Sequence, residues 1–220
     1  MKIGTWNIER LKHSKNIEEI TSILENLDMD ILVLTETDER IKPSNYRFEI
    51  TTKSLAGINS GYYRNTERRV KIFSKYEVVK EYETYDKYTS CCAELKTENG
   101  NLLVYGTIIG IYGNRNENFK EDLPKQIDDF KNLSKNQNLC VIGDYNISFS
   151  DNYYFTNMGR GELNKCFAEN GIENLTQNLS QTIDHIAISQ KFIANTKIIT
   201  NEWGIEKKLS DHKGISLFLN

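Results

Sequence analysis

Acidic and amide residues stand at the ends of several apolar runs in this chain, and the last of these positions pairs an acid with a histidine. The segments TWNIER, LTETDE, VIGDYNIS, TIDHIAIS and LSDHKG contribute Asn7 and Glu9, Glu36, Asp144 and Asn146, Asp184, and Asp211 and His212. One such residue on its own is usually a turn residue that bonds its own backbone. Five strand ends with the same character indicate instead that these side chains converge at one end of a sheet and act together.

The apolar runs and helical periodicities predict the elements that position these residues. Residues 2–8 form a β-prone run, and apolar residues at intervals of three and four predict a helix over residues 15–30. The almost continuous apolar run at residues 30–37 predicts a central strand buried on both faces. This order leaves Asn7 and Glu36 at the carboxyl ends of two strands.

The rest of the chain contains more strands than helices. Residues 46–111 predict an antiparallel meander, followed by a helix around Phe119–Phe130 with Pro124 in its first turn. A strand at 138–146, a helix at 162–170 that stops at Gly171, and strands at 182–189, 197–203 and 213–219 complete the pattern. We therefore predict an α/β (α+β) fold of two packed β-sheets flanked by helices, in a single domain over residues 1–220.

Composition excludes some classes of protein. The chain is 38% hydrophobic and 27% charged with a net charge of −3, which is typical of a soluble globular protein and lacks the strong basic surplus of a duplex-binding protein. No run approaches the length of a membrane span, and the first fifteen residues contain no apolar core of signal-peptide length, so we expect a cytoplasmic protein. The four cysteines show no metal-ligand spacing and are interpreted as buried free thiols, with Cys91 and Cys92 on opposite faces of one strand.

In this order and context the five segments resemble the endonuclease/exonuclease/phosphatase superfamily. Its members are metal-dependent phosphoesterases such as pancreatic-type deoxyribonuclease, abasic-site endonucleases, inositol polyphosphate 5-phosphatases and bacterial sphingomyelinases. The resemblance extends from Trp6-Asn7 to Asp211-His212, and GDYN followed by IDHI and SDH is its most specific part. It implies a four-layered sandwich with two central mixed sheets, in agreement with the strand pattern.

The resemblance assigns a metal site to the acids. Glu36 is the principal ligand of a divalent ion, Mg²⁺ or Mn²⁺; Asn7 helps to order the site, and Asp211 helps to hold the ion or its hydration shell. Mg²⁺ prefers oxygen ligands and is often held by one or two carboxylates with waters and substrate phosphate. Glu9 lies two residues after Asn7, on the same face if the strand continues, and is either a second ligand or a solvated surface residue.

The resemblance also assigns the catalytic residues. Asp144 orients and deprotonates the attacking water, and Asn146 donates an amide hydrogen bond to a phosphoryl oxygen. Asp184 holds the His212 imidazole and favours its cationic form, while His212 stabilises the growing charge on the phosphate. His185 is expected to point to the opposite strand face and to be structural.

Other polar residues have weaker assignments. Tyr112 and Arg115 are candidates for phosphate contact, and His13 is expected at the surface. Alternation places Arg69 and Lys71, with Lys75, on one strand face, which is either a solvated edge or a track that guides nucleic acid to the metal. Many members of the superfamily end the middle strand with His or Tyr, whereas this chain has Ile109 and Gly110, so no leaving-group acid is assigned there.

These observations favour a hydrolase that cleaves P–O bonds by in-line attack of an activated water, a nuclease or related phosphodiesterase. The alternatives are a phosphatase for a small or lipid-derived phosphate ester, and a catalytically weakened module that binds phosphorylated ligands. The expected partner is a phosphate-ester substrate, with DNA and RNA as candidates. We expect a monomer and no membrane span.

Overall fold

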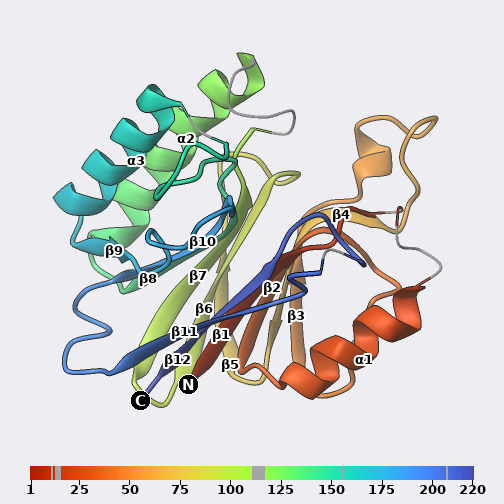
Figure 1. Cartoon of the computed structure of the whole chain (residues 1–220), viewed down its shortest axis with the longest axis horizontal. Coiled ribbons are helices and arrows are strands. Elements are labelled where there is room, and N and C mark those ends of the chain that lie inside the picture. Colours follow the sequence, from red (N-terminus) through yellow and green to blue (C-terminus); the bar gives the residue numbers. More distant parts are fainter. Residues whose placement is uncertain (11, 13–15, 111–116, 155, 207) are drawn as a thin grey trace.

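Two six-stranded β-sheets pack face to face, and helices cover their outer faces (Figure 1). The computed structural model describes residues 1–10, 12, 16–110, 117–154, 156–206 and 208–220. The first sheet has the order β11-β12-β1-β2-β4-β3 and the second the order β5-β6-β7-β8-β10-β9.

The bounds of the elements follow the apolar runs of the sequence. The first sheet contains β1 (Lys2–Asn7), β2 (Ile31–Asp38), β3 (Phe48–Thr51), β4 (Glu67–Ser74), β11 (Ile198–Trp203) and β12 (Gly214–Leu219). The second contains β5 (Glu77–Tyr82), β6 (Ser90–Thr97), β7 (Gly100–Ile108), β8 (Leu139–Asp144), β9 (Ile172–Asn174) and β10 (Asp184–Ser189). The helices are α1 (Ile17–Leu27), α2 (Glu117–Ser134) and α3 (Asn157–Glu169), with a short 3₁₀ turn, η2 (Leu55–Gly57).

Three apolar clusters hold four layers together. The cluster between the sheets joins inward-facing residues of both, such as Val33 and Ile142. A second cluster packs α2 and α3 on the outer face of the second sheet through Phe130 and Phe167, and a third packs α1 on the first sheet through Leu24. The predicted α/β fold with two mixed sheets flanked by helices is confirmed.

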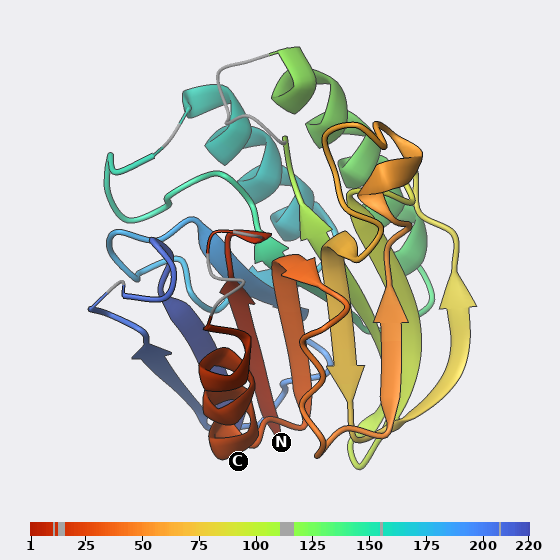
Figure 2. The ribbon, with the colours of Figure 1, turned by 90° about the vertical axis from the view of Figure 1, so that its right-hand side faces the viewer.

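Strand direction brings the functional ends of both sheets together. β1 runs parallel to β2, and β7 runs parallel to β8. The N- and C-termini lie side by side at the opposite end of the sheets, where the N-terminal amine donates to the Leu219 carbonyl at 2.9 Å (Figure 2). The carboxyl ends of the parallel strands therefore form one rim, which is where α/β sheets commonly bind ligands.

Several details differ from the expected elements, including the start of α3, which begins at Asn157 and not at residue 162. Residues 46–111 do not form one meander, because β3 and β4 belong to the first sheet and β5, β6 and β7 to the second. Pro124 lies in the interior of α2 and not in its first turn. Strand β9 was not predicted; it is only three residues long, too short for a hydrophobic period to mark.

The four cysteines lie on the strand and helix faces that bury them. All four cysteines are free and buried, and Cys91 packs into the cluster between the sheets while Cys92 packs under the helices. Alternation along β6 thus predicted their opposite faces correctly.

Within the described residues, no helix is both long and apolar enough to cross a membrane.

Candidate active site

The rim of the two sheets brings together most of the residues that end the apolar runs. Asn7 ends β1 and Asp144 ends β8, and the Asn7 Nδ2 donates to Asp144 Oδ2 across the two sheets at 3.1 Å. Asp184 begins β10 directly opposite Asp144 in the antiparallel register, and His212 lies in the loop before β12. The predicted convergence is therefore present, with contacts between residues far apart in the chain.

Asp144 is a buried carboxylate held from both sides. Asn7 donates to one oxygen and the backbone N–H of Asn146 donates to the other at 2.8 Å. Burial raises the pKa of Asp144, the negative charge of Asp184 adds to this effect, and His212 offsets part of it, so the pKa rises from 3.8 to about 7. A carboxylate with a pKa near neutrality and a fixed orientation is suited to accept a proton at physiological pH.

Gly143 allows β8 to present Asp144 in this position. Its φ is +135°, and a Cβ atom there would lie 2.2 Å from the carbonyl oxygen of Thr107 on β7. Only glycine accommodates this close approach without moving the strand. The glycine of the GDYN segment thus has a defined role in placing the acid that follows it.

His212 and Asp184 form a close pair. His212 Nδ1 lies 2.6 Å from Asp184 Oδ2, and Asp184 is buried while the His212 side chain is 17% exposed. Burial opposes the charged ring, but attraction to Asp184 outweighs it, with Asp144 and Asp211 adding to the effect, so the pKa of His212 rises from 6.5 to about 10. The ring is therefore a cation at neutral pH, oriented with Nδ1 towards Asp184.

A serine that the sequence did not single out ties this loop to β1. Ser210 Oγ donates to the Asn7 carbonyl at 2.6 Å and accepts the His212 N–H at 3.1 Å. The Trp6 indole N–H donates to the His212 carbonyl at 3.0 Å. In the sequence this role is marked only by the serine that precedes Asp211-His212. A serine at such a position is usually an ordinary turn residue, so its contact with β1 could not be predicted.

Glu36 lies on the rim but is not free. It has a φ of 46° and lies on β2 between Thr35 and Thr37, which pair with Val70 and Arg68 of β4. Arg69 Nη1 donates to Glu36 Oε1 at 2.9 Å, and Arg10 Nε lies 3.9 Å from Glu36 Oε2. A non-glycine residue in the left-handed region is strained and commonly marks a functional position.

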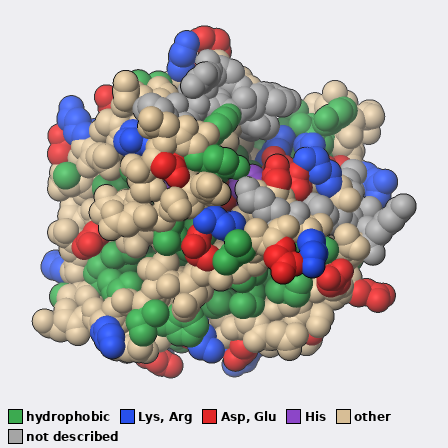
Figure 3. All heavy atoms as spheres, in the orientation of Figure 1, with side chains coloured by type: hydrophobic (Ala, Val, Ile, Leu, Met, Phe, Trp, Pro, Cys, Tyr) green, Lys and Arg blue, Asp and Glu red, His purple; other side chains and the backbone are tan. Residues whose placement is uncertain are grey.

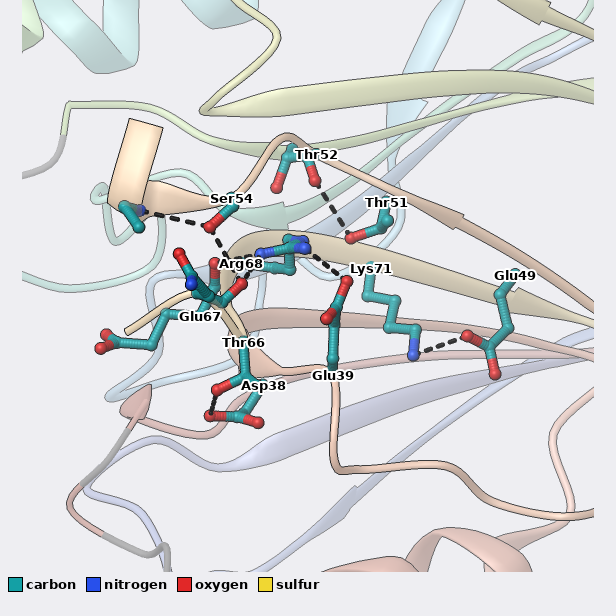
Figure 4. Close-up of polar contacts among 12 residues, drawn as sticks. Asp38, Glu39, Glu49, Thr51, Thr52, Ser54, Thr66, Glu67, Arg68 and Lys71 are labelled. Atoms are coloured by element: carbon teal, nitrogen blue, oxygen red, sulfur yellow. Dashed lines mark hydrogen bonds and ion pairs between the residues drawn. The ribbon is translucent and has the colours of Figure 1, made fainter. Parts of the chain in front are cut away.

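The prediction that Arg69 and Lys71 form an exposed strand face is wrong. Both are 1% exposed, and Arg69 Nη1 donates to Glu36. Figure 4 shows Lys71 directed towards Glu49, and its Nζ lies 2.7 Å from Glu49 Oε2. The alternation was correct, but this face of β4 lies inside the molecule, where each cation has an acidic partner. Of the proposed face only Lys75 remains partly exposed, and it pairs with Asp28 at 2.7 Å.

Glu9 and Asn146 differ from their expected positions because their strands end earlier. Glu9 has a φ of 51° and is buried; its carboxylate pairs with Lys12 and accepts the Asp211 N–H at 2.9 Å, so it is not a solvated surface residue. Asn146 Nδ2 donates to the carbonyls of Ile109 and Gly110 at 3.0 and 2.8 Å. These contacts use the amide N–H groups expected to reach a phosphoryl oxygen, so Asn146 holds the loop around Asp144 instead.

The rim offers carboxylate and amide oxygens, the donor type that hard divalent cations prefer. The described residues contain no group of three or more His, Cys, Asp or Glu arranged to hold a metal ion. Glu36 and Asp211 offer carboxylate oxygens, both partly exposed, and Asn7 offers an amide oxygen that already accepts the Glu9 N–H at 3.0 Å. Mg²⁺ and Mn²⁺ suit such an all-oxygen site because Mg²⁺ keeps several waters and needs one or two carboxylates.

A hollow of about 270 Å³ opens beside the histidine, lined by Asn146, Tyr153, Tyr154, Gln181, Thr182, Ile183, Asp184, Asp211, His212 and Lys213. Figure 3 shows a recess on this face with a histidine side chain at its floor and acidic and basic side chains beside it. A larger hollow of about 980 Å³, lined by residues such as Asn136, Gln137 and Leu103, lies at the other end of the second sheet. We take the smaller of these two hollows as the candidate substrate site because Asn146, Asp184, Asp211 and His212 line it, whereas the larger hollow is lined by other residues.

Of the remaining residues discussed from the sequence, some are described by the structure and some are not. His185 is buried on the opposite face of β10, as predicted; its ring nitrogens lie 3.0 Å from Thr176 Oγ1 and 2.9 Å from the Ile147 carbonyl, and burial lowers its pKa to about 4. Tyr112, Arg115 and His13 lie outside the described residues. At the end of β7, Ile109 is fully buried and the Gly110 N–H donates to Asp122.

Solved structures share this fold at low sequence identity. The 3′ phosphatase NExo from Neisseria, bound to a product DNA hairpin, superposes with a TM-score of 0.74 at 16% identity, over 100% of this chain and 99% of that one. An AP endonuclease from Archaeoglobus fulgidus gives a TM-score of 0.72 at 15% identity, with coverage of 100% and 99%. A protein described as endonuclease/exonuclease/phosphatase from Beutenbergia cavernae gives 0.72 at 13% identity, with coverage of 100% and 71%.

Sequence comparison assigns the chain to a family, whereas the solved structures show only the shared fold. Comparison with curated proteins gives no match. Residues 4–212 match the Endonuclease/Exonuclease/phosphatase family, a range that contains every described residue of the rim discussed above. The chain therefore belongs to the endonuclease/exonuclease/phosphatase family.

Proposed function

We propose that the chain is a divalent-metal-dependent phosphoesterase, specifically a nuclease or related phosphodiesterase, and that it acts as one domain. The observation that carries the proposal is the junction at the rim, where Asn7 holds Asp144 and Asp184 holds His212. The family contains nucleases and phosphatases, which supports hydrolysis of a phosphate ester.

In the proposed reaction Asp144 accepts a proton from the attacking water. Its raised pKa of about 7 gives a basic form that is populated at neutral pH and a driving force for taking the proton. Asn7 and the Asn146 backbone N–H fix the carboxylate, so the water is presented in one direction. The water oxygen forms the new P–O bond as the bond to the leaving oxygen breaks, without a covalent enzyme intermediate.

His212 supplies positive charge where the phosphoryl oxygens gain negative charge. Its Nδ1 is engaged by Asp184, so Nε2 is the nitrogen that can donate to substrate. A preorganised cation of this kind stabilises the transition state more than the ground state. Asp184 acts through His212 and is a positioning residue.

Glu36 would hold the divalent ion, with Asp211 as the second carboxylate. When bound, the ion polarises a phosphoryl oxygen as a Lewis acid. Glu9 positions Asp211 by accepting its backbone N–H and is not itself proposed as a ligand. Asn146 is proposed to position Asp144, since its side-chain amide is occupied by backbone carbonyls.

We propose a substrate that presents a short or terminal phosphodiester. Arg69 and Lys71 are buried, so they offer no basic track along which a long duplex could bind. The chain as a whole has a net charge of −3 and lacks a basic surplus. The hollow beside His212 has a volume of about 270 Å³, which corresponds to a small chemical group or to a single unit of a polymer. The similar Neisseria protein, bound to a DNA hairpin, supports testing DNA ends first.

Hydrolysis of bis-p-nitrophenyl phosphate tests the proposal directly. We expect turnover with added Mn²⁺ or Mg²⁺, loss of turnover in EDTA, and loss of turnover in Asp144→Asn. Asp128→Asn, which changes an exposed carboxylate on α2, serves as the matched control and should keep wild-type activity. Turnover that survives EDTA and the Asp144 substitution would refute the proposal.

A substrate panel then separates the alternatives. Single- and double-stranded DNA, abasic DNA, RNA, inositol phosphates and p-nitrophenyl phosphate should be compared at equal metal concentration. Preference for nucleic-acid ends supports the nuclease assignment, whereas preference for a monoester supports a phosphatase. Binding of phosphorylated ligands without hydrolysis of any of them would favour a recognition module.

A further inference from the structure

Arg69 is a buried cation aimed at the proposed metal ligand. Nη1 donates to Glu36 Oε1 at 2.9 Å, and Nη2 donates to the Tyr63 hydroxyl at 3.1 Å. Its Nε, also buried, donates to no acceptor among the described residues. A guanidinium has five N–H donors and cannot lose its charge, so Arg69 keeps unused donor capacity in the interior of the site.

A second arginine completes a charge-balanced network around Glu36. Arg10 Nε lies 3.9 Å from Glu36 Oε2 and 3.8 Å from Glu67 Oε2, and Glu67 is 1% exposed. The guanidinium carbons of Arg10 and Arg69 lie 5.4 and 5.6 Å from the centroid of the Tyr63 ring, within the range of cation–π attraction. Two arginines and two glutamates give this network no net formal charge, so it is balanced before any metal arrives.

A divalent cation at Glu36 would upset this balance. It would add two positive charges next to two guanidinium groups in a partly desolvated pocket, where repulsion is weakly screened. Arg69 cannot escape into solvent, because its side chain is only 2% exposed. A phosphate ester beside the ion would relieve the repulsion, since its negatively charged oxygens coordinate hard cations and offset the positive charge of the guanidinium groups.

We propose that Arg69 is an internal counter-ion of Glu36 that competes with the divalent metal and makes metal binding depend on a phosphate group in the same site. Arg10 assists it from the other carboxylate oxygen. Metal and phosphate then bind with positive cooperativity, and linkage requires that each strengthens the other by the same factor. This inference rests on the proposed function, because it takes Glu36 as the ligand of the metal.

Direct measurement of Mn²⁺ binding tests the inference without any catalysis. Free Mn²⁺ is measured by electron paramagnetic resonance in titrations of EDTA-treated protein, with and without inorganic phosphate, and with protein-free phosphate blanks. For the wild type we expect saturating phosphate to tighten Mn²⁺ binding about tenfold, within the usual range of coupling between sites. In Arg69→Met we expect Mn²⁺ alone to bind about tenfold more tightly than to the wild type, with most of the phosphate effect lost.

Arg68→Met is the matched control. Arg68 is the neighbouring residue on β4, and its side chain is 11% exposed. Its guanidinium pairs with the Glu39 carboxylate (Figure 4) and donates to the backbone carbonyls of Asn65 and Glu67, not to the carboxylates of Glu36 or Glu67. Its loss should leave both Mn²⁺ titrations unchanged. If circular dichroism shows that Arg69→Met does not fold, Arg10→Gln carries the test, since the Arg10 side chain is 25% exposed and its loss should tighten Mn²⁺ binding in the same direction.

The outcomes separate this inference from the proposed function. Mn²⁺-dependent hydrolysis together with equal Mn²⁺ affinities in the wild type and the Arg69 or Arg10 variant would overturn the inference alone. A wild-type Mn²⁺ affinity that does not respond to phosphate would also overturn it. Failure of every variant to bind Mn²⁺, with phosphate or without, would overturn both the inference and the metal dependence of the proposed function.

Discussion

Asp184→Asn isolates the charge that keeps His212 cationic. The carboxylate is buried, and its Oδ2 lies 2.6 Å from His212 Nδ1. An amide has nearly the same shape and can accept the same hydrogen bond, so the substitution removes one charge with little change in packing. The ring then keeps its burial, which disfavours the cation, and loses the strongest attraction that offsets it.

The expected effect on the pKa of His212 is large. In the folded wild type the pKa is raised from 6.5 to about 10, and each unit of pKa corresponds to about 1.4 kcal/mol. The shift corresponds to a free energy of at most about 5 kcal/mol in favour of the cation. Solvent screening of the partly exposed ring reduces this free energy. Because the folded pKa is raised, this stabilisation is fully present below pH 6.5 and is lost as pH rises through about 10. In Asp184→Asn we expect the pKa to fall by about two units or more.

Histidine NMR titration of the metal-free protein measures this shift. The wild-type His212 ring should remain protonated through pH 8, whereas the variant ring should titrate at or below neutrality. His185 is an internal control, since its pKa is lowered to about 4 by burial and its ring should stay neutral in both proteins. Titration of wild-type His212 near pH 6.5, or the same pKa in both proteins, would refute the assignment of Asp184 as its counter-ion.

Three further substitutions test other parts of the site. Glu36→Gln should weaken Mn²⁺ binding and lower activity by about tenfold or more. The protein should still fold, but with a lower urea midpoint, because the buried Arg69 loses its charged partner; an unaltered dependence of rate on metal concentration would contradict the ligand assignment. His212→Ala and Asp184→Ala should each lower kcat on the order of 10² or more, and the double variant should lose little beyond the worse single one; multiplicative losses would mean that the two act independently. Gly143→Ala should destabilise the fold by several kcal/mol, about 3 or more, because its Cβ would lie 2.2 Å from the Thr107 carbonyl; a wild-type midpoint in urea would show that β8 can shift freely.

The placement of the site could be predicted from sequence because strand ends are encoded locally. Apolar runs at β1, β2 and β8 stop where Asn7, Glu36 and Asp144 begin, and buried parallel strands must end on one rim. The family resemblance added the pairing of Asp184 with His212, which no local pattern contains. The structure places them 2.6 Å apart, although they are separated by 28 positions in the chain.

The exposure of charged residues could not be predicted in the same way. Arg69 and Lys71 alternate as expected on β4, but whether a charged strand face is solvated depends on partners elsewhere in the chain. Those partners are Glu36 and Glu49 on neighbouring strands of the same sheet, and nothing in the local sequence identifies them. Local pattern gives the direction of a side chain, whereas its burial is a property of the assembled sheet.

The facing carboxylates at the rim explain how one site can hold both a base and a cation. Asp144 and Asp184 are directly opposed in the register of β8 and β10, so each feels the charge of the other. Their partners divide the roles: Asp184 has the His212 ring, whereas Asp144 has the neutral donors of Asn7 and the Asn146 backbone. Since burial and the charge of Asp184 raise the pKa of Asp144 to about 7 while the pKa of His212 rises to about 10, the basic carboxylate and the cationic ring coexist between these values. The Asp184 carboxylate that keeps His212 charged thus also raises the pKa of Asp144, while the His212 cation offsets part of this effect. Both effects depend on the register of β8 and β10.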